Sequence, residues 1–192
     1  MAKKLCFAFH CDDFADLRAN VVRKHNFTKG VEQTGYYDSS IWEESKKKGD
    51  VALKRMINAE LENTSVTAVP IGSQTYARRW VRHELMKSVE RGNRLLGIDI
   101  NSIKGKDQKT KPLGPDPLAH LRLQISPDGK KVSPRVWDGQ KCLFYSDLDP
   151  FNIDEQPVAQ RWKNFQLSYW FTTYDWVAHD GFNNFSSWIE YV

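Results

Sequence analysis

The chain has few cysteines and no long hydrophobic run. Its 192 residues include three cysteines, Cys6, Cys11 and Cys142, which cannot form a paired disulfide framework. A secretory signal peptide needs an apolar core of about 7–15 residues and a membrane span needs about 20, whereas the opening MAKKLCFAFHCDDF has only a short apolar run. These absences exclude a disulfide-rich secreted protein and a membrane protein, and they predict a cytoplasmic location.

A strong charge of one sign is also missing. The formal net charge is +4, and both signs are interspersed along the chain. A nucleic-acid-binding protein usually has a basic stripe, but the dense basic run here is confined to Lys46–Lys48, for which we expect a solvated loop. The composition therefore predicts neither a nucleic acid nor a membrane as partner.

Short apolar runs alternate with helical patterns along the first 150 residues. The runs are continuously hydrophobic, which is typical of strands that are covered on both faces in a parallel sheet. We expect strands at Leu5–Phe9, Val66–Ile71, Leu95–Ile100 and Cys142–Tyr145, and a weaker one near Thr34–Tyr37.

Three helices are predicted between these strands. The first spans Asp13–Lys24 with Asp12 or Asp13 as its cap, the second begins at Asp50, and the third spans about Thr75–Glu90 and ends before Gly92. Strand–helix alternation of this kind predicts an open, flavodoxin-like α/β sheet.

Aromatic residues are concentrated after Pro150, and at this density they usually pack against a domain. We therefore expect one domain over residues 1–192, with a core of about 1–150 and an aromatic-rich extension of about 151–192 packed on it. The aromatic residues are Trp162, Phe165, Tyr169, Trp170, Phe171, Tyr174, Trp176, Phe182, Phe185 and Trp188.

Ligands of open parallel sheets bind at the carboxyl ends of the strands. Two stretches fall there, FHCDDF after the first strand and IGSQT after the strand that ends at Ile71. Their candidate substrate contacts are Phe9, His10, Asp12 and Ser73, although a plain helix cap is the commoner role for an aspartate at the position of Asp12.

When the side chains of the third predicted helix are placed at about 100° per residue, Glu84 falls inside the apolar arc. A buried charge costs several kcal/mol unless it is paired. Either Glu84 forms a salt bridge with an arginine such as Arg78, or its carboxylate faces a cleft at the carboxyl edge of the sheet. The arc consists of Ala77, Trp80, Val81, Leu85 and Val89, and the outward or edge positions are Arg79, Arg82, His83 and Glu90.

One carboxylate beside aromatic side chains suits cleavage of the nicotinamide–ribose bond. Nicotinamide leaves as a neutral group, so a strong general acid is not required, and a fixed carboxylate stabilises the developing ribosyl cation. No second acid lies near RRWVRHEL in the sequence. We therefore expect no poised water nucleophile at this carboxylate.

Three patches in order resemble a bacterial branch of TIR-like domains. GSQTYARRWVRHEL resembles the strand and helix signature G-x-x-T…W-V-x-x-E-[IL], KLCFAFHCDD resembles the first strand, and YDWVAHDGFNNFSSWIE resembles the closing segment. The whole pattern is similar to the TIR-like proteins of Thoeris anti-phage systems. His10 and Cys11 replace the serine or tyrosine that this branch usually has after the first strand. The candidate for the loop that covers the substrate is Gly35–Trp42.

The resemblance implies a cytosolic enzyme of the NAD glycohydrolase or ADP-ribosyl cyclase type. Such an enzyme consumes NAD as substrate, needs no cofactor or metal, and makes a cyclic ADP-ribose-type signal for a separate effector. The family's catalytic glutamate matches Glu84, and its preceding aromatic position matches Trp80. With no second acid near Glu84 in the sequence, the resemblance further implies slow NAD hydrolysis before activation and a cyclic product from intramolecular attack. It leaves open whether activation involves a homo-oligomer.

Other readings of the sequence are weaker. A non-catalytic TIR-like adaptor that acts by self-association is the serious alternative, and an exposed or ion-paired Glu84 would favour it. A receiver domain is disfavoured because Ile71, Gly72 and Ser73 stand where it needs an aspartate. A zinc site of Cys6, His10 and Cys11 is disfavoured because no fourth ligand is evident and because Cys11 lies on the opposite strand face from Cys6 and His10. A Ser-His-Asp triad is disfavoured because no G-x-S-x-G elbow is present.

Overall fold

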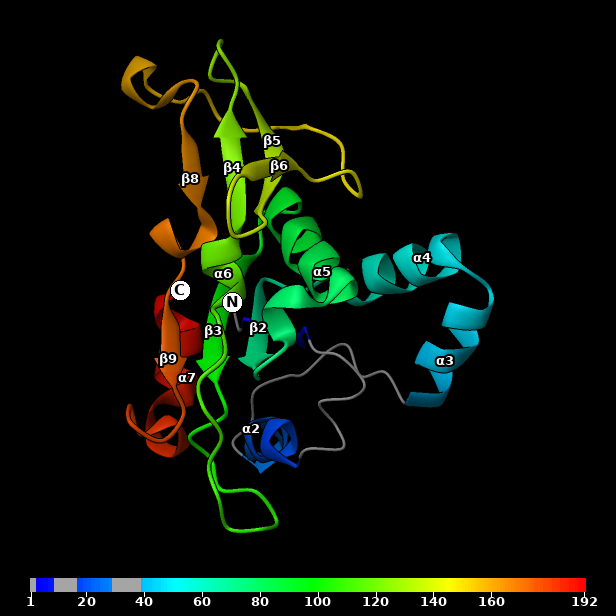
Figure 1. Cartoon of the computed structure of the whole chain (residues 1–192), viewed down its shortest axis with the longest axis vertical. Helices are drawn as coiled ribbons and strands as arrows, with labels where there is room; N and C mark the ends of the chain where they lie inside the picture. The colour runs from blue at the N-terminus through cyan, green and yellow to red at the C-terminus, as the bar shows by residue number, and fades with distance from the viewer. Residues whose placement is uncertain (1–2, 9–16, 29–38) are drawn as a thin grey trace.

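The computed structural model describes residues 3–8, 17–28 and 39–192, and it contains two sheets with flanking helices (Figure 1). In chain order the elements are β1 (Leu5–Phe7), α2 (Arg18–Thr28), α3 (Ser39–Lys47), α4 (Asp50–Glu60), β2 (Val66–Ile71), the 3-10 turn η1 (Thr75–Ala77), α5 (Arg79–Glu90), β3 (Arg94–Asp99), α6 (Pro117–His120), β4 (Leu121–Ile125), β5 (Lys131–Trp137), β6 (Cys142–Phe144), β7 (Phe151–Asn152), η2 (Val158–Gln160), β8 (Asn164–Gln166), η3 (Leu167–Tyr169), β9 (Thr173–Asp175) and α7 (Gly181–Tyr191).

The first sheet is parallel, with the strand order β1-β2-β3-β9. Val66 of β2 pairs with Leu5 of β1 on one side and with Arg94 of β3 on the other. Gly97 of β3 pairs with Thr173 of β9. The predicted α/β fold is confirmed, and three of the four clear apolar runs are strands of this sheet.

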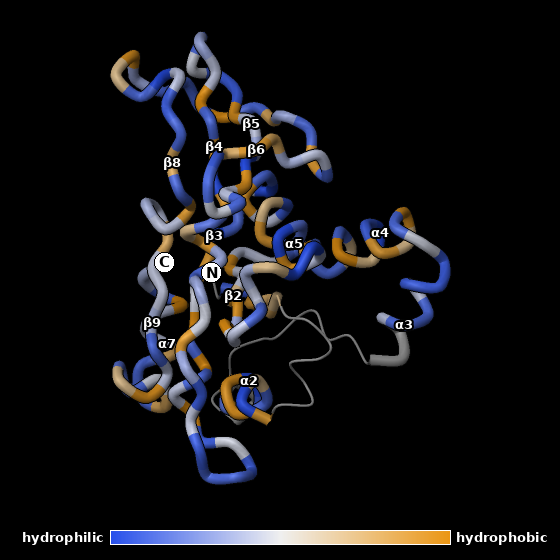
Figure 2. Tube along the Cα trace, viewed as in Figure 1, coloured by the Kyte–Doolittle hydropathy of each residue, from blue (hydrophilic) through white to orange (hydrophobic). Residues whose placement is uncertain are grey.

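Helices cover both faces of the parallel sheet. One face packs against α2 and α7, with Leu96 and Ile98 of β3 in contact with this layer. The other face packs against α5, whose Leu85 lies in the same cluster as Val69 of β2. Burial on both faces explains the continuous hydrophobic runs. In Figure 2 the far end of the loop after β3 is, by contrast, hydrophilic. Within the described ranges, no helix is long and apolar enough to cross a membrane.

The aromatic segment after Pro150 contributes to both sheets. Its strand β9 extends the parallel sheet, and the rings of Tyr174 and Trp188 stack with centroids 4.4 Å apart. Phe185 is fully buried in the α7 layer. The prediction of packing is therefore confirmed for Trp176, Phe185 and Trp188, which are buried. It is wrong for four exposed aromatic residues, Trp162, Tyr169, Trp170 and Phe182.

The second sheet is antiparallel, with the order β6-β5-β4-β8 and with β7 on β5. In Figure 1 it extends beyond the amino-terminal ends of the parallel strands. The prediction that Cys142–Tyr145 is a covered parallel strand is wrong, because β6 is an edge strand of this sheet and exposes Leu143 and Phe144. β4 connects this sheet to the apolar cluster under α5 through Leu121 and Leu123, and β8 contributes Phe165.

Three predicted boundaries differ from the structure. Helix α2 is described from Arg18 and continues to Thr28, four residues beyond the predicted end at Lys24. The predicted loop at Lys46–Lys48 is wrong, because Lys46 and Lys47 form the exposed last turn of α3. The weak strand near residues 34–37 lies outside the described residues, as do the proposed caps at positions 12 and 13.

Gly97 brings β3 and β9 close together, which gives a test of this pairing. An added Cβ at Gly97 would lie 2.1 Å from Thr173 Oγ1 and 2.9 Å from Thr173 Cβ. We expect Gly97→Ala to destabilise the fold by about 1–3 kcal/mol, as overpacking does, which lowers Tm by roughly 2–10 °C in a chain of this size.

Thermal unfolding followed by circular dichroism measures this effect. Arg94→Ala is the control, since Arg94 is an exposed residue of the same strand and such changes usually stay within about 0.5 kcal/mol. Equal Tm values for both variants would show that β9 does not approach β3 this closely.

Candidate functional site

Helix α5 begins after a short turn at the carboxyl end of β2. The backbone N–H of Gly72 donates to Thr75 Oγ1 over 2.9 Å, and η1 follows before α5 begins at Arg79. The helix ends at Glu90, just before Gly92 with its positive φ of 82°, as expected for a glycine stop. The predicted helix therefore exists, but its first turn is a separate 3-10 turn.

Hydroxyl groups fasten the middle of α5 to the sheet. Ser88 Oγ donates to the backbone carbonyl of Glu84 over 2.7 Å, and the hydroxyls of Thr67 and Ser88 lie 2.9 Å apart. All three residues are buried. These bonds fix the turn that carries Glu84 against β2.

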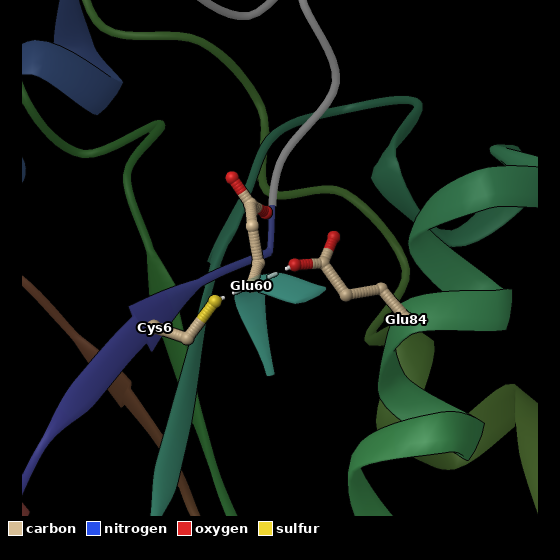
Figure 3. Close-up of side chains that lie close together, drawn as sticks. All are labelled: Cys6, Glu60 and Glu84. Atoms are coloured by element: carbon tan, nitrogen blue, oxygen red, sulfur yellow. Dashed lines mark hydrogen bonds between the residues drawn. The ribbon is translucent and has the colours of Figure 1, made fainter. Parts of the chain in front are cut away.

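The Glu84 side chain points inward and is only 5% exposed. Cys6 Sγ of β1 donates to Glu84 Oε1 over 3.7 Å (Figure 3). Within the part of the chain that the structure describes, no ion pair joins Glu84 to a lysine or arginine, so the salt bridge to Arg78 is not formed there. The interior position inferred from helical periodicity is correct.

Burial changes the protonation of both partners. Desolvation raises the pKa of Glu84 to about 8, and the hydrogen bond from Cys6 acts in the opposite direction. Burial and the nearby carboxylates Glu84 and Glu60 raise the pKa of the Cys6 thiol well above its usual value. The thiol is therefore neutral at neutral pH and acts as the donor.

A second carboxylate reaches this place from α4. The sulfur of Cys6 and one carboxylate oxygen each of Glu60 and Glu84 all lie within 4.8 Å of one another. Figure 3 shows the two carboxyl groups on the same side of the thiol. The expectation of a single acid was wrong, because it considered only sequence neighbours of Glu84. Leu53, Ile57 and Glu60 share one helix face, so the same interrupted apolar pattern could have identified Glu60.

Ion pairs hold α4 and α5 together at their amino-terminal ends. The Arg79 guanidinium donates twice to the Asp147 carboxylate, each time over 2.8 Å, and contacts Asp50 Oδ2 at 2.8 Å. The Lys54 ammonium lies 3.3 Å from Oδ1 of Asp147. These cations lower the pKa of Asp147 to about 2. The network fixes the relative position of the helices that carry Glu60 and Glu84.

Trp80 lies one turn before Glu84 and is half-buried. It packs against the cluster of Cys6, Ile57 and Leu61, and the Arg79 guanidinium carbon lies 4.7 Å from its ring centroid. The structure therefore brings Trp80 and Glu84 together around Cys6.

The other predicted contacts do not join this cluster. Ser73 is exposed, and its hydroxyl accepts a hydrogen bond of 3.0 Å from Asn101 in the loop after β3. Phe9, His10 and Asp12 lie outside the described residues, as do Cys11 and residues 35–38 of the proposed substrate loop.

Two positions on the predicted helix face are corrected. Ala77 is exposed because it belongs to η1, where the α-helical period of α5 does not apply. His83 is buried rather than outward, its Nδ1 has no hydrogen-bond partner, and its ring packs edge-on against Trp80. Burial and the nearby Lys54 lower the pKa of His83 to about 4, so its imidazole is neutral at neutral pH.

The parallel sheet and the helix that carries Glu84 define a TIR-like α/β domain. The model of the family described as Thoeris protein ThsB, TIR-like domain, matches residues 6–104, which include β1, α4, β2 and α5. The chain belongs to this family. It is also 49% identical over 192 residues to a protein of Bacillus cereus (strain MSX-D12) named "Putative cyclic ADP-D-ribose synthase ThsB1", covering 99% of this chain and 100% of that protein.

Proposed function

We propose that the protein is an NAD-consuming enzyme of bacterial anti-phage defence that acts in the cytoplasm. It breaks the bond between nicotinamide and ribose and forms a cyclic ADP-ribose-type nucleotide, which activates a separate effector. The observation that carries the proposal is the buried carboxylate of Glu84, which accepts a hydrogen bond from Cys6 and lies within 4.8 Å of a Glu60 carboxylate oxygen. The name of the Bacillus cereus relative supports the product class.

The chemistry needs only a few groups. The electron pair of the C1–N bond leaves with the ring nitrogen, which gives neutral nicotinamide and a ribosyl cation. The Glu84 carboxylate stabilises this cation as it forms. Attack by an adenine nitrogen or a hydroxyl of the same nucleotide then closes the ring, and a hydroxyl nucleophile loses its proton to a base or to water. In this proposal NAD is a substrate, and no cofactor is required.

Burial of the carboxylate supports a trigger. At 5% exposure Glu84 presents very little surface to a nucleotide in this conformation, so we expect surrounding segments to move before substrate reaches it. Activation by a conformational change or by self-association supplies that movement. An adaptor role requires no buried acid, and the inward Glu84 beside Trp80 favours the enzyme over that alternative.

Purified protein tests the proposal directly. We expect incubation with NAD to release nicotinamide slowly or not at all, and activated protein to convert NAD into nicotinamide and a cyclic ADP-ribose isomer in equal amounts. Chromatography with mass spectrometry measures nicotinamide, linear ADP-ribose and cyclic products. Cells that express the protein, with and without phage challenge, provide the activated state.

Glu62→Gln serves as the control for this experiment, and two results would contradict the proposed function. Glu62→Gln should behave as the parent, because Glu62 is exposed. Fast linear hydrolysis to ADP-ribose without any trigger would recast the protein as a plain NAD hydrolase. Unchanged NAD in phage-challenged cells would favour the adaptor.

A further inference from the structure

We propose that Cys6 and Glu60 are positioning residues for Glu84. In this arrangement the thiol holds one carboxylate oxygen and the two carboxyl groups share a single proton until a cationic substrate arrives. The inference rests on the proposed function, since it concerns the working state of Glu84. It also goes beyond that function, because neither residue is the family's catalytic glutamate or its preceding aromatic position.

The geometry supports a three-residue unit. The thiol of Cys6 is fully buried and donates to Glu84 Oε1 over 3.7 Å. Oε1 of Glu60 is buried as well, and the three groups lie within 4.8 Å of one another. They come from β1, α4 and α5, so they meet only in the folded chain.

Two carboxylates so close in a dry place cannot both ionise without a large cost. They titrate as a pair, and the pair retains a proton at neutral pH. The pyridinium ring of the substrate and the ribosyl cation formed from it are positive. Their approach favours loss of the shared proton and leaves Glu84 ionised at the moment when its charge is needed.

The groups that face Glu84 can be named for the described residues. Cys6 of β1 and Glu60 of α4 face the Glu84 carboxyl. On α5 itself, burial lowers the pKa of the neighbouring His83 and keeps it neutral, and the charges that act on it are those of Lys54, Asp147, Lys87 and Arg79. The thiol stabilises the ionised form of Glu84 by donation, whereas a like charge on Glu60 at this distance would disfavour it.

Substitutions of the two residues therefore have opposite effects. We expect Glu60→Gln to lower the midpoint of Glu84 titration by about one pH unit, because a like charge is removed. Cys6→Ala removes a donor and should raise the midpoint, while Cys6→Ser retains a donor and should shift it back toward the parent value. A general loss of folding would not move the midpoints in opposite directions.

Two readouts follow the midpoint in the full-length protein. Carbon-13 NMR of labelled glutamate carboxyl groups reports it without turnover, with the Glu84 resonance assigned by its loss in Glu84→Gln. The pH profile of kcat/KM for NAD reports it in activated protein. Glu62→Gln is the matched control for Glu60→Gln, since it makes the same change at an exposed site.

The outcomes separate this inference from the proposed function. Opposite midpoint shifts together with an active Glu84→Gln would support the three-residue unit and reject the function. Unmoved midpoints, or shifts in the same direction, would overturn the unit even if Glu84→Gln is inactive. Loss of activity on treatment with a chelator, restored by Zn²⁺, would also overturn it, because the three groups would then be metal ligands.

Discussion

Glu84→Gln is expected to abolish production of the nucleotide signal, a loss of at least about 10³-fold in kcat/KM. The substitution removes the charge that stabilises the ribosyl cation and changes little volume. Mass spectrometry of nicotinamide and cyclic products in activated protein measures the loss. Production at the parent's rate would show that Glu84 is not the catalytic carboxylate, and Glu62→Gln provides the unaffected control.

The same variant should fold well, with a stability that depends on pH in a defined way. In the folded state the pKa of Glu84 is raised to about 8, whereas an unfolded glutamate titrates near 4.3. Between these values the folded chain retains a proton that the unfolded chain releases, so the free energy of unfolding of the parent falls as pH rises. Gln resembles the neutral acid and does not titrate.

Thermal melts at two pH values test this sign. We expect the Tm of Glu84→Gln relative to the parent to be higher at pH 8.5 than at pH 5.5. A Tm difference that is the same at both values would show that Glu84 is not buried in this way. This measurement needs no trigger and no substrate.

Periodicity predicted the parallel sheet well because both faces of its strands are covered. The run Val66–Ile71 is entirely buried and matches β2 residue for residue. The run at Cys142 is also continuously hydrophobic, but it lies at an edge, with Leu143 39% exposed. A run of four residues contains no information about its partner strand, so its sheet could not be predicted from the sequence.

The antiparallel sheet left a pattern that could have been found. Leu121, Leu123 and Ile125 of β4 are buried and alternate with half-buried polar residues. This alternation is typical of a strand with one covered face. No strand or helix was predicted between residues 118 and 141, and the sheet was missed for that reason.

The candidate site shows the same division between local and tertiary information. Glu84 was identified from the helix period alone, because a charge inside an apolar arc is a local pattern. Its two neighbours, Cys6 and Glu60, reach it from other elements. Sequence separations of 78 and 24 residues give no local indication of such a meeting, although Glu60 interrupts an apolar face of its own helix.

The second large effect is expected when the carboxyl-terminal segment is removed. Ending the chain after Asp149 removes β8, β9 and α7, and with them the fully buried Leu167 and Phe185. The free edges of β3 and β4 and the apolar face against which α7 packs would then be open to solvent. We propose that the chain folds as one unit that includes this segment.

We expect the chain truncated after Asp149 to aggregate, because it exposes large apolar patches and unpaired strand edges. Size-exclusion chromatography and thermal melts of residues 1–149 measure this, and a soluble fragment that melts cooperatively would show that the segment is separable. Two point variants locate the effect within α7. Trp188 is 6% exposed and Tyr191 is 87% exposed, so Trp188→Ala should cost about 3–5 kcal/mol while Tyr191→Ala should be nearly neutral. Equal stability of the two variants would mean that α7 does not pack on the sheet through its tryptophan, and the one-unit proposal would fail.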